Sequence, residues 1–194
     1  MAGTALTDFQ KKKILDVFNT LYDTNKDGVI ELTDFEEAIK KFCSIHKWPK
    51  DGDKYIAAKH TMSTIWDGLR GFADYDEDNK VTKDEWLKMW SSCVGDLSTD
   101  GDKGFPDWQK NYMEFMFTVN DTSGDGFIDK SEYTTLYTAF GIDKATCETT
   151  FDRLAQGTNG KISKEDFKTL WKEYFVSNDR NARGNFLFGK PPSA

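Results

Sequence analysis

Apolar residues recur along this chain with the spacing of one helix face, and the same frame appears four times. In each repeat, apolar side chains precede a polar loop of twelve residues and return at positions 13, 16, 17 and 20 counted from the loop's start. The stripes before the loops are Ile14/Phe18/Leu21, Ile65/Leu69/Phe72, Tyr112/Met116/Val119 and Cys147/Phe151/Leu154, and those after are Phe35/Ala38/Ile39/Phe42, Trp86/Met89/Trp90/Cys93, Tyr133/Leu136/Tyr137/Phe140 and Phe167/Leu170/Trp171/Tyr174. Spacings of three and four line one side of a helix, so the pattern predicts four helix–loop–helix units.

Two further regularities support this frame. Position 8 of every loop is β-branched, which suits a short strand that pairs two adjacent loops; these residues are Ile30, Val81, Ile128 and Ile162. Capping pairs that suit a helix start are Thr7/Gln10, Thr82/Glu85, Asp129/Glu132 and Ser163/Asp166. We therefore expect a compact all-α fold of four units in two pairs, with residues 1–95 and 106–176 forming the pairs and residues 177–194 forming a tail that packs on the core.

Three of the loops carry oxygen side chains in the spacing that surrounds a seven-coordinate hard cation. This is the EF-hand pattern, in which positions 1, 3, 5, 9 and 12 and the main-chain carbonyl of position 7 supply the ligands. The predicted ligands are Asp23, Asn25, Asp27, Val29, Glu31 and Asp34 in the first loop, Asp74, Asp76, Asp78, Lys80 and Glu85 in the second, and Asp121, Ser123, Asp125, Phe127, Asp129 and Glu132 in the third. The sequence thus predicts three calcium sites.

Each departure from the pattern has a consequence. Asp34 is one methylene shorter than the usual glutamate, which disfavours bidentate contact and would allow Mg²⁺ at the first site. Asn79 stands where glycine is usual in the second loop, but asparagine tolerates the left-handed conformation. In the fourth loop, Ala155 and Gly157 offer no side-chain oxygen at positions 1 and 3. We expect that loop to bind no metal and to pair with the third.

Two other stretches resemble sites and are interpreted otherwise. Residues 96–107 nearly spell a fifth loop, but Lys103 falls at position 8 and Pro106 where the exiting helix should begin, so we expect a solvated turn. Residues 184–190 match the phosphate-loop spacing, yet Pro191 and Pro192 follow, where a helix would be needed. Nucleotide binding is therefore not expected, and no arrangement of a nucleophile and a base indicates an enzyme.

Composition narrows the partners. The formal charge is −7 with 26 Lys and Arg, which argues against nucleic acid, and three calcium ions would offset six of these negative charges. The three cysteines fall within helical patterns, which suggests reduced thiols and a cytoplasmic location. No apolar run is long enough to cross a bilayer. We expect a monomer.

The whole chain resembles the invertebrate sarcoplasmic calcium-binding proteins, and more closely the calexcitins, a neuronal group among them. The likeness rests on residues 23–35 with Asp at position 12, on residues 66–70, 86–90 and 119–125, and on the tail segments 173–180 and 184–189. The resemblance implies three active sites, a silent fourth, calcium signalling in the cytoplasm, and action on membrane ion channels.

Two main functions follow from these observations. A sensor needs a Met-rich face that calcium uncovers, and the chain has five Met. The residues alone favour a calcium buffer slightly, whereas the resemblance favours a sensor. We therefore expect a calexcitin-like sensor in neuronal-type calcium signalling, with a sarcoplasmic-type Ca²⁺/Mg²⁺ buffer without a switchable partner as the alternative. A third alternative, a cavity for an aromatic small ligand as in the photoproteins, rests on the 14% aromatic content, which packing of the core also explains.

Overall fold

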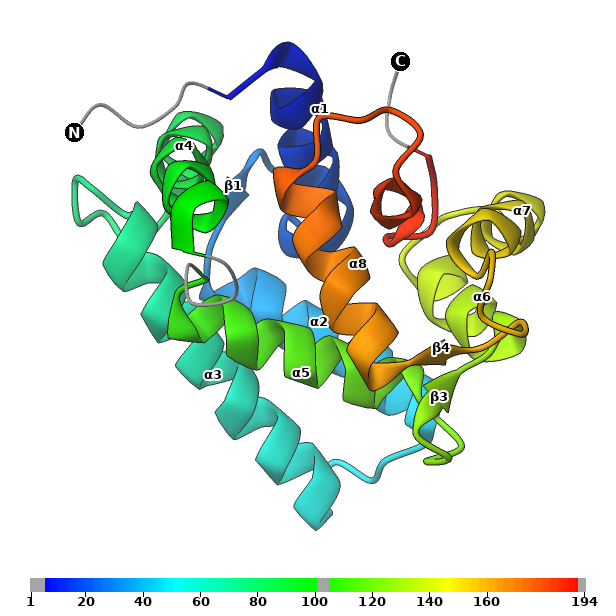
Figure 1. The fold of residues 1–194 in the computed structure, drawn as a ribbon. Coiled ribbons are helices and arrows are strands. Elements are labelled where there is room, and N and C mark those ends of the chain that lie inside the picture. Colours follow the sequence, from blue (N-terminus) through cyan, green and yellow to red (C-terminus); the bar gives the residue numbers. More distant parts are fainter. Residues whose placement is uncertain (1–5, 101–104, 192–194) are drawn as a thin grey trace.

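The chain folds into the four helix–loop–helix units that its apolar pattern predicts (Figure 1). The computed structural model describes residues 6–100 and 105–191, and only the backbone of residues 96–100. The described α-helices are α1 (Asp8–Val17), α2 (Leu32–His46), α3 (Asp53–Ala73), α4 (Lys83–Asp100), α5 (Asp107–Asn120), α6 (Lys130–Ala139), α7 (Lys144–Leu154) and α8 (Lys164–Val176). A π-helical turn, η1 (Phe18–Tyr22), continues α1, and a 3₁₀ turn, η3 (Arg183–Phe186), follows α8. No helix in these described ranges is long and apolar enough to cross a membrane.

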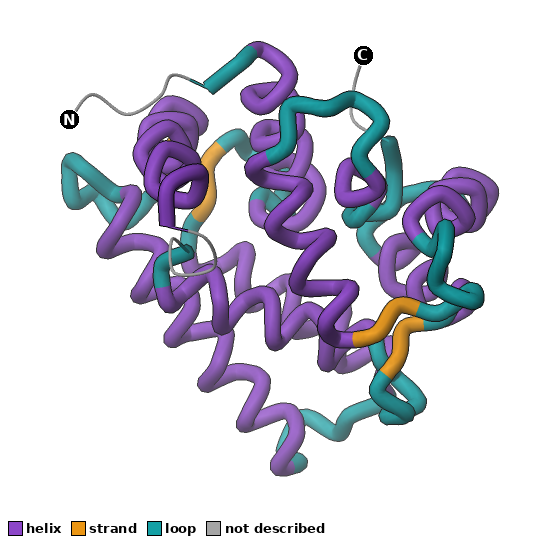
Figure 2. The backbone as a smooth tube through the Cα atoms, in the orientation of Figure 1, coloured by secondary structure: helices purple, strands orange, loops and turns teal. Residues whose placement is uncertain are grey.

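The loops pair through two very short antiparallel sheets (Figure 2). Strand β1 (Val29–Ile30) pairs with β2 (Val81–Thr82), and β3 (Phe127–Ile128) pairs with β4 (Ile162–Ser163). Their register sets Ile30 opposite Val81 and Ile128 opposite Ile162. The expected pairing through position 8 is confirmed, and it joins the first loop to the second and the third to the fourth.

The helix starts also follow the sequence. The side chains of Thr7, Asp129 and Ser163 each accept a hydrogen bond from the main-chain N–H three residues on, and the side chain of that later residue accepts one from the N–H of the cap residue. Thr82 and Glu85 make the same reciprocal bonds at the start of α4. These contacts satisfy N–H groups that a helix start otherwise leaves unpaired.

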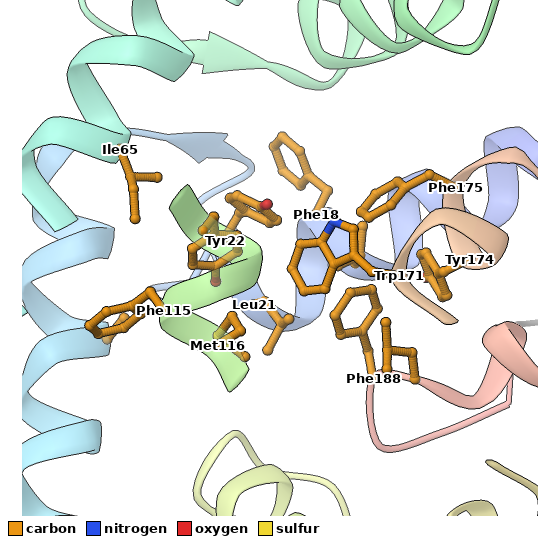
Figure 3. Packing of buried hydrophobic residues seen from close by; sticks show 14 of the residues in the cluster. Phe18, Leu21, Tyr22, Ile65, Phe115, Met116, Trp171, Tyr174, Phe175 and Phe188 are labelled. Carbon is orange, nitrogen blue, oxygen red and sulfur yellow. The ribbon is translucent and has the colours of Figure 1, made fainter. Parts of the chain in front are cut away.

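One apolar core runs through both pairs of units. Buried residues of all eight α-helices belong to a single packed cluster, and Trp86, Trp90 and Trp171 are fully buried within it. Trp90 of α4 stacks on Phe175 of α8 with ring centroids 4.2 Å apart, and Tyr22 lies 4.9 Å from Tyr112 of α5. Figure 3 shows Phe18 and Tyr22 gathered with Trp171 and Phe175, which come from the other end of the sequence. The two pairs therefore share their largest side chains.

These rings leave little enclosed space. A gap beside Leu21, Tyr22 and Met62 has no measurable volume, and one beside Tyr174 and Phe188 holds about 10 Å³. Pockets for small ligands are typically several hundred Å³. Within the described core, the aromatic content fills the interior, so the photoprotein-like alternative has no preformed cavity to support it.

The segment after α8 lies against the core. Leu187 and Phe188 are buried, and the Phe188 ring is 4.5 Å from that of Tyr174. Figure 3 shows Phe188 beside Trp171, Tyr174 and Phe175. Lys13 of α1 is fully buried beneath this segment, and its Nζ donates to the Ser177 carbonyl at 2.7 Å and to Asn185 Oδ1 at 2.9 Å. The residues that match the phosphate-loop spacing thus follow a helix and turn at η3, not a strand.

Two local expectations were wrong. Phe72 was predicted to line the inner face of α3, but it is 55% exposed because the buried stripe continues from Leu69 to Ala73 instead. Residues 96–100 were predicted to begin a turn, but their backbone is the last part of α4. The rest of that near-match to a loop, residues 101–104, lies outside the described residues.

Candidate metal centres

The three oxygen-rich loops each connect two helices of one unit. The first loop (residues 23–34) joins η1 to α2, the second (residues 74–85) joins α3 to α4, and the third (residues 121–132) joins α5 to α6. In the second loop, carboxylate oxygens of Asp74, Asp76 and Asp78 lie within 4.8 Å of one another. Calcium, a hard divalent cation, takes oxygen ligands at 2.3–2.6 Å, so oxygens this close can share one ion.

A shared backbone shape brings the ligands together. The first residue of each loop leaves its helix with nearly the same dihedral angles, φ −81° and ψ 79° at Asp23, φ −75° and ψ 89° at Asp74, and φ −72° and ψ 76° at Asp121. Positions 4 and 6 then adopt positive φ in all three loops, at Lys26 and Gly28, Glu77 and Asn79, and Gly124 and Gly126. These left-handed residues curl the chain around its own first carboxylate.

That first carboxylate gathers main-chain N–H groups. Asp23, Asp74 and Asp121 each accept from the N–H groups of loop positions 5 and 6, at 2.9–3.1 Å. These bonds orient the carboxylate toward the loop interior. Asn79 occupies position 6 with φ 66°, so its predicted tolerance of the left-handed conformation is confirmed, and its Oδ1 accepts from Arg70 at 2.5 Å.

The acid at position 12 closes each loop. Glu132 accepts from the N–H groups of Ser123 at 2.8 Å and Asp129 at 3.0 Å. Glu85 makes the equivalent contacts with Tyr75 and Thr82, both at 2.9 Å. Asp34 spans the same gap despite its shorter side chain, accepting from Thr24 and Glu31 at 2.9 Å each and from Asn25 at 3.2 Å.

Burial distinguishes the first loop from the second. Asp23 and Asp34, at positions 1 and 12, are 2% and 1% exposed, whereas Asp74 and Glu85 at the same positions of the second loop are only partly buried. Burial raises the pKa of the Asp34 carboxyl, and its hydrogen bonds oppose this only in part. Partial burial also acts to raise the pKa of Glu85, but hydrogen bonds from Thr82, Tyr75 and Asp76 outweigh it, so that pKa is lowered. The first site is therefore more enclosed.

The fourth loop (residues 155–166) differs in its backbone as well as its side chains. Ala155 has ψ 9°, and the positive φ angles fall at Gly157, Asn159 and Gly160, which are positions 3, 5 and 6. The Thr158 N–H and hydroxyl both bond to the Ala155 carbonyl, at 3.1 and 2.8 Å. The turn thus closes on itself where a ligand-bearing loop would open around an ion.

Lysines of the second and fourth loops reach across the paired strands, a contact that the sequence pattern did not reveal. Lys161 Nζ donates to Asp125 Oδ2 at 2.6 Å, and Lys80 Nζ lies 3.9 Å from Glu31 Oε2. Both lysines occupy position 7 of the second loop in their pair. In the sequence, only this shared position could have pointed to the two contacts, because the contacts themselves depend on how the strands pair.

Several known proteins are similar to this chain in sequence and in fold. The EF-hand family model matches residues 71–90 and 116–137, which contain the second and third loops. The sarcoplasmic calcium-binding proteins I, III and IV of the amphioxus Branchiostoma lanceolatum are 31% identical over 96% of this chain and 100% of theirs. Calexcitin-1 of Caenorhabditis elegans is 30% identical, covering 93% of this chain and 86% of its own. The solved structure of an amphioxus sarcoplasmic calcium-binding protein superposes with a TM-score of 0.82, at 28% identity over 96% of this chain and 100% of that one.

Loop geometry, fold and these matches define an EF-hand calcium-binding protein. The identity over nearly the whole length is more specific. The chain belongs to the family of sarcoplasmic calcium-binding proteins and calexcitins.

Proposed function

We propose that this protein binds three calcium ions, one in each of the first three loops, through the seventeen ligands predicted above. The observation that carries the proposal is the backbone shape common to these loops and lost in the fourth. Four carboxylates per loop fit a hard dication, and the position 12 acid already bridges both ends of each loop. The fourth loop stays empty and acts as the structural partner of the third.

Calorimetric titration of the metal-free protein tests this stoichiometry. We expect three calcium ions per chain, two after Glu85→Gln and two after Glu132→Gln. Asp166→Asn in the fourth loop is the matched control and should leave three. Four ions in the parent protein, or loss of an ion in the control, would contradict the proposal.

For the first site, we propose the weakest preference for calcium over magnesium. Asp34 is the ligand at position 12, and its side chain is shorter than that of the usual glutamate. Mg²⁺ accepts fewer ligands than calcium, in a tighter, octahedral arrangement. In millimolar Mg²⁺ without calcium, this site should fill first. A competition titration in which the second or third site holds Mg²⁺ more strongly would refute this assignment.

Buffering is the role that we favour for these sites, in the cytoplasm. Buffer EF-hands open little on binding calcium, whereas sensors expose a Met-rich groove. Here Met62, Met89 and Met116 are buried, and Leu187 and Phe188 of the tail occupy the core beside α8. The three cysteines are buried thiols, which suits a reducing compartment.

A second candidate, a signalling sensor, rests on an open cleft beside the third loop. The cleft has a volume of about 780 Å³ and is lined by Trp48, Phe115 and Val119, with Thr122 and Ser123 of the loop in its wall. Calcium at this loop could change the cleft and its fit to a partner, such as the membrane ion channel that the calexcitin resemblance implies.

Hydrophobic-dye fluorescence separates the two roles. A buffer should show little change in dye binding when calcium is added, and a sensor a large increase. Deleting residues 184–194 supplies the positive control, because removing buried Leu187 and Phe188 should raise dye binding and lower thermal stability in the calcium-loaded protein. A large calcium-dependent increase in the intact chain would reject the buffer role.

A further inference from the structure

The fourth loop places a positively charged lysine side chain beside the third loop. Lys161, at its position 7, lies beside Ile162 of strand β4, whose register with β3 is fixed by the Ile128–Ile162 pair. Its Nζ is 2.6 Å from Asp125 Oδ2 and 5.6 Å from the centre of the Phe127 ring. Asp125 and Phe127 are positions 5 and 7 of the third loop, so one lysine contacts two adjacent ligand positions.

The surrounding charges are those of the third loop. The ammonium group lies within hydrogen-bond distance of the Asp125 carboxylate, and Asp129 and Glu132 of the same loop add further negative charge. Both partners are about half exposed, so the pair remains accessible to water.

We propose that the fourth loop tunes the third site, with Lys161 acting as a tethered cation that stabilises the empty loop and lowers its affinity for calcium. The inference rests on the proposed calcium site in the third loop. An empty loop with four carboxylates repels itself, and a fixed ammonium reduces that repulsion. A bound dication removes the same repulsion and is itself repelled by the lysine. Lys161 thus favours the empty state relative to the loaded one.

The first pair provides an internal comparison. Lys80 holds the equivalent position 7, but its Nζ is 3.9 Å from Glu31 Oε2 and no hydrogen bond joins them. Glu31 is at position 9, farther round the loop than Asp125 at position 5. The same residue at the same position therefore acts more weakly on the first site than Lys161 acts on the third.

Calorimetry on a graded series of substitutions tests the proposal. At low salt, Lys161→Gln should tighten calcium binding at the third site by about 2- to 5-fold, the range of exposed ion pairs. Lys161→Glu should tighten it further, and Lys161→Arg should leave it near the parent value. The differences should shrink at high salt, because exposed charges are screened. Unchanged or weaker binding in Lys161→Gln would overturn the proposal.

Stability without calcium gives a second, independent readout. In excess chelator, Lys161→Gln should lower the melting temperature, since the empty third loop loses its counter-charge. The matched control is Lys164→Gln, which removes the same charge three residues away, where the lysine pairs with Glu114 of α5 and not with an acid of the third loop. An equal affinity change in this control would assign the effect to net charge and refute the local contact.

Glu132→Gln distinguishes failure of this inference from failure of the proposed site. If the third loop binds calcium, Glu132→Gln removes one ion, and Lys161→Gln has no further effect on affinity in that background. If Glu132→Gln leaves three ions, the proposed site itself is wrong. If it removes one ion while Lys161→Gln alone changes nothing, only the role of Lys161 is wrong.

Discussion

The first and second loops face each other across strands β1 and β2, yet their closing acids lie in different surroundings. Asp34 is 1% exposed, beside Leu21, Met62 and Tyr112 from three separate elements. Glu85 closes a loop whose other carboxylates reach solvent. Both acids make the same main-chain contacts. The same closing position thus lies within the core in one loop and nearer the surface in the other.

The largest expected difference is in the stability of the metal-free fold. Asp34→Ala leaves the partly buried N–H groups of Thr24 and Glu31 without an acceptor, and an unpaired group costs up to roughly 1–3 kcal/mol where water cannot reach it. Glu85→Ala should cost less than about 1 kcal/mol, because water can reach the groups it leaves. Urea unfolding in chelator measures both, and equal losses would remove the distinction between the loops.

The second largest difference should be in the selectivity of the two sites for calcium over magnesium. Asp34→Glu restores the longer arm and should shift the first site toward calcium over magnesium on the order of tenfold, which equals about 1.4 kcal/mol. Glu85→Asp is the reciprocal change and should shift the second site toward magnesium. Competition titrations with both ions report each ratio. No shift in either variant would show that arm length does not set selectivity.

A smaller difference between Asp34 and Glu85 should appear in their pKa values in the metal-free protein. The pKa of Asp34 is raised in the fold, so the folded state holds its proton more tightly and this group's contribution to stability falls as pH rises through that pKa. The pKa of Glu85 is lowered, so its contribution is present at neutral pH and is lost as pH falls. NMR titration of the side-chain carboxyl carbons in chelator should therefore show the pKa of Asp34 above the ordinary value for aspartate and that of Glu85 below the ordinary value for glutamate.

The smallest effect should come from the left-handed residues at position 4. Lys26 and Glu77 have φ 65° and 60°, where the third loop has Gly124. Lys26→Gly and Glu77→Gly should each raise stability by about 0.5 kcal/mol, since relief of strain exceeds the entropy cost of glycine. Thermal unfolding measures the change. A loss of stability at Lys26 alone would indicate that its side chain supports the enclosed loop.

Local patterns sufficed to predict the fold and the loops, because both follow from spacing. Position 8 residues meet across the strands, and the capping pairs Thr82/Glu85 and Asp129/Glu132 form as expected, since the twelve-residue spacing leaves few alternatives. Features that depend on distant neighbours were not predicted. Phe72 matches the buried spacing of Leu21 and Val119, but among the described residues its side of α3 is left largely exposed as the helix ends.

The enclosure of Asp34 has the same origin. Met62 and Tyr112, which help to cover it, come from α3 and α5, and no local signal links them to the first loop. The contact between Lys161 and Asp125 likewise requires the register of β3 and β4. Short-range pattern therefore determines which atoms each loop offers, and long-range packing determines the environment in which they act.

The buried amine of Lys13 has a consequence for how the chain is made. Its burial lowers the pKa to about 8, and its acceptor Asn185 is 172 residues away. A buried amine without acceptors is costly, so α1 cannot settle in its final place before the segment around Asn185 has been synthesised. Helix α1 thus reaches its final place only once the segment around Asn185 is available, and the enclosed first loop that follows α1 is completed no earlier.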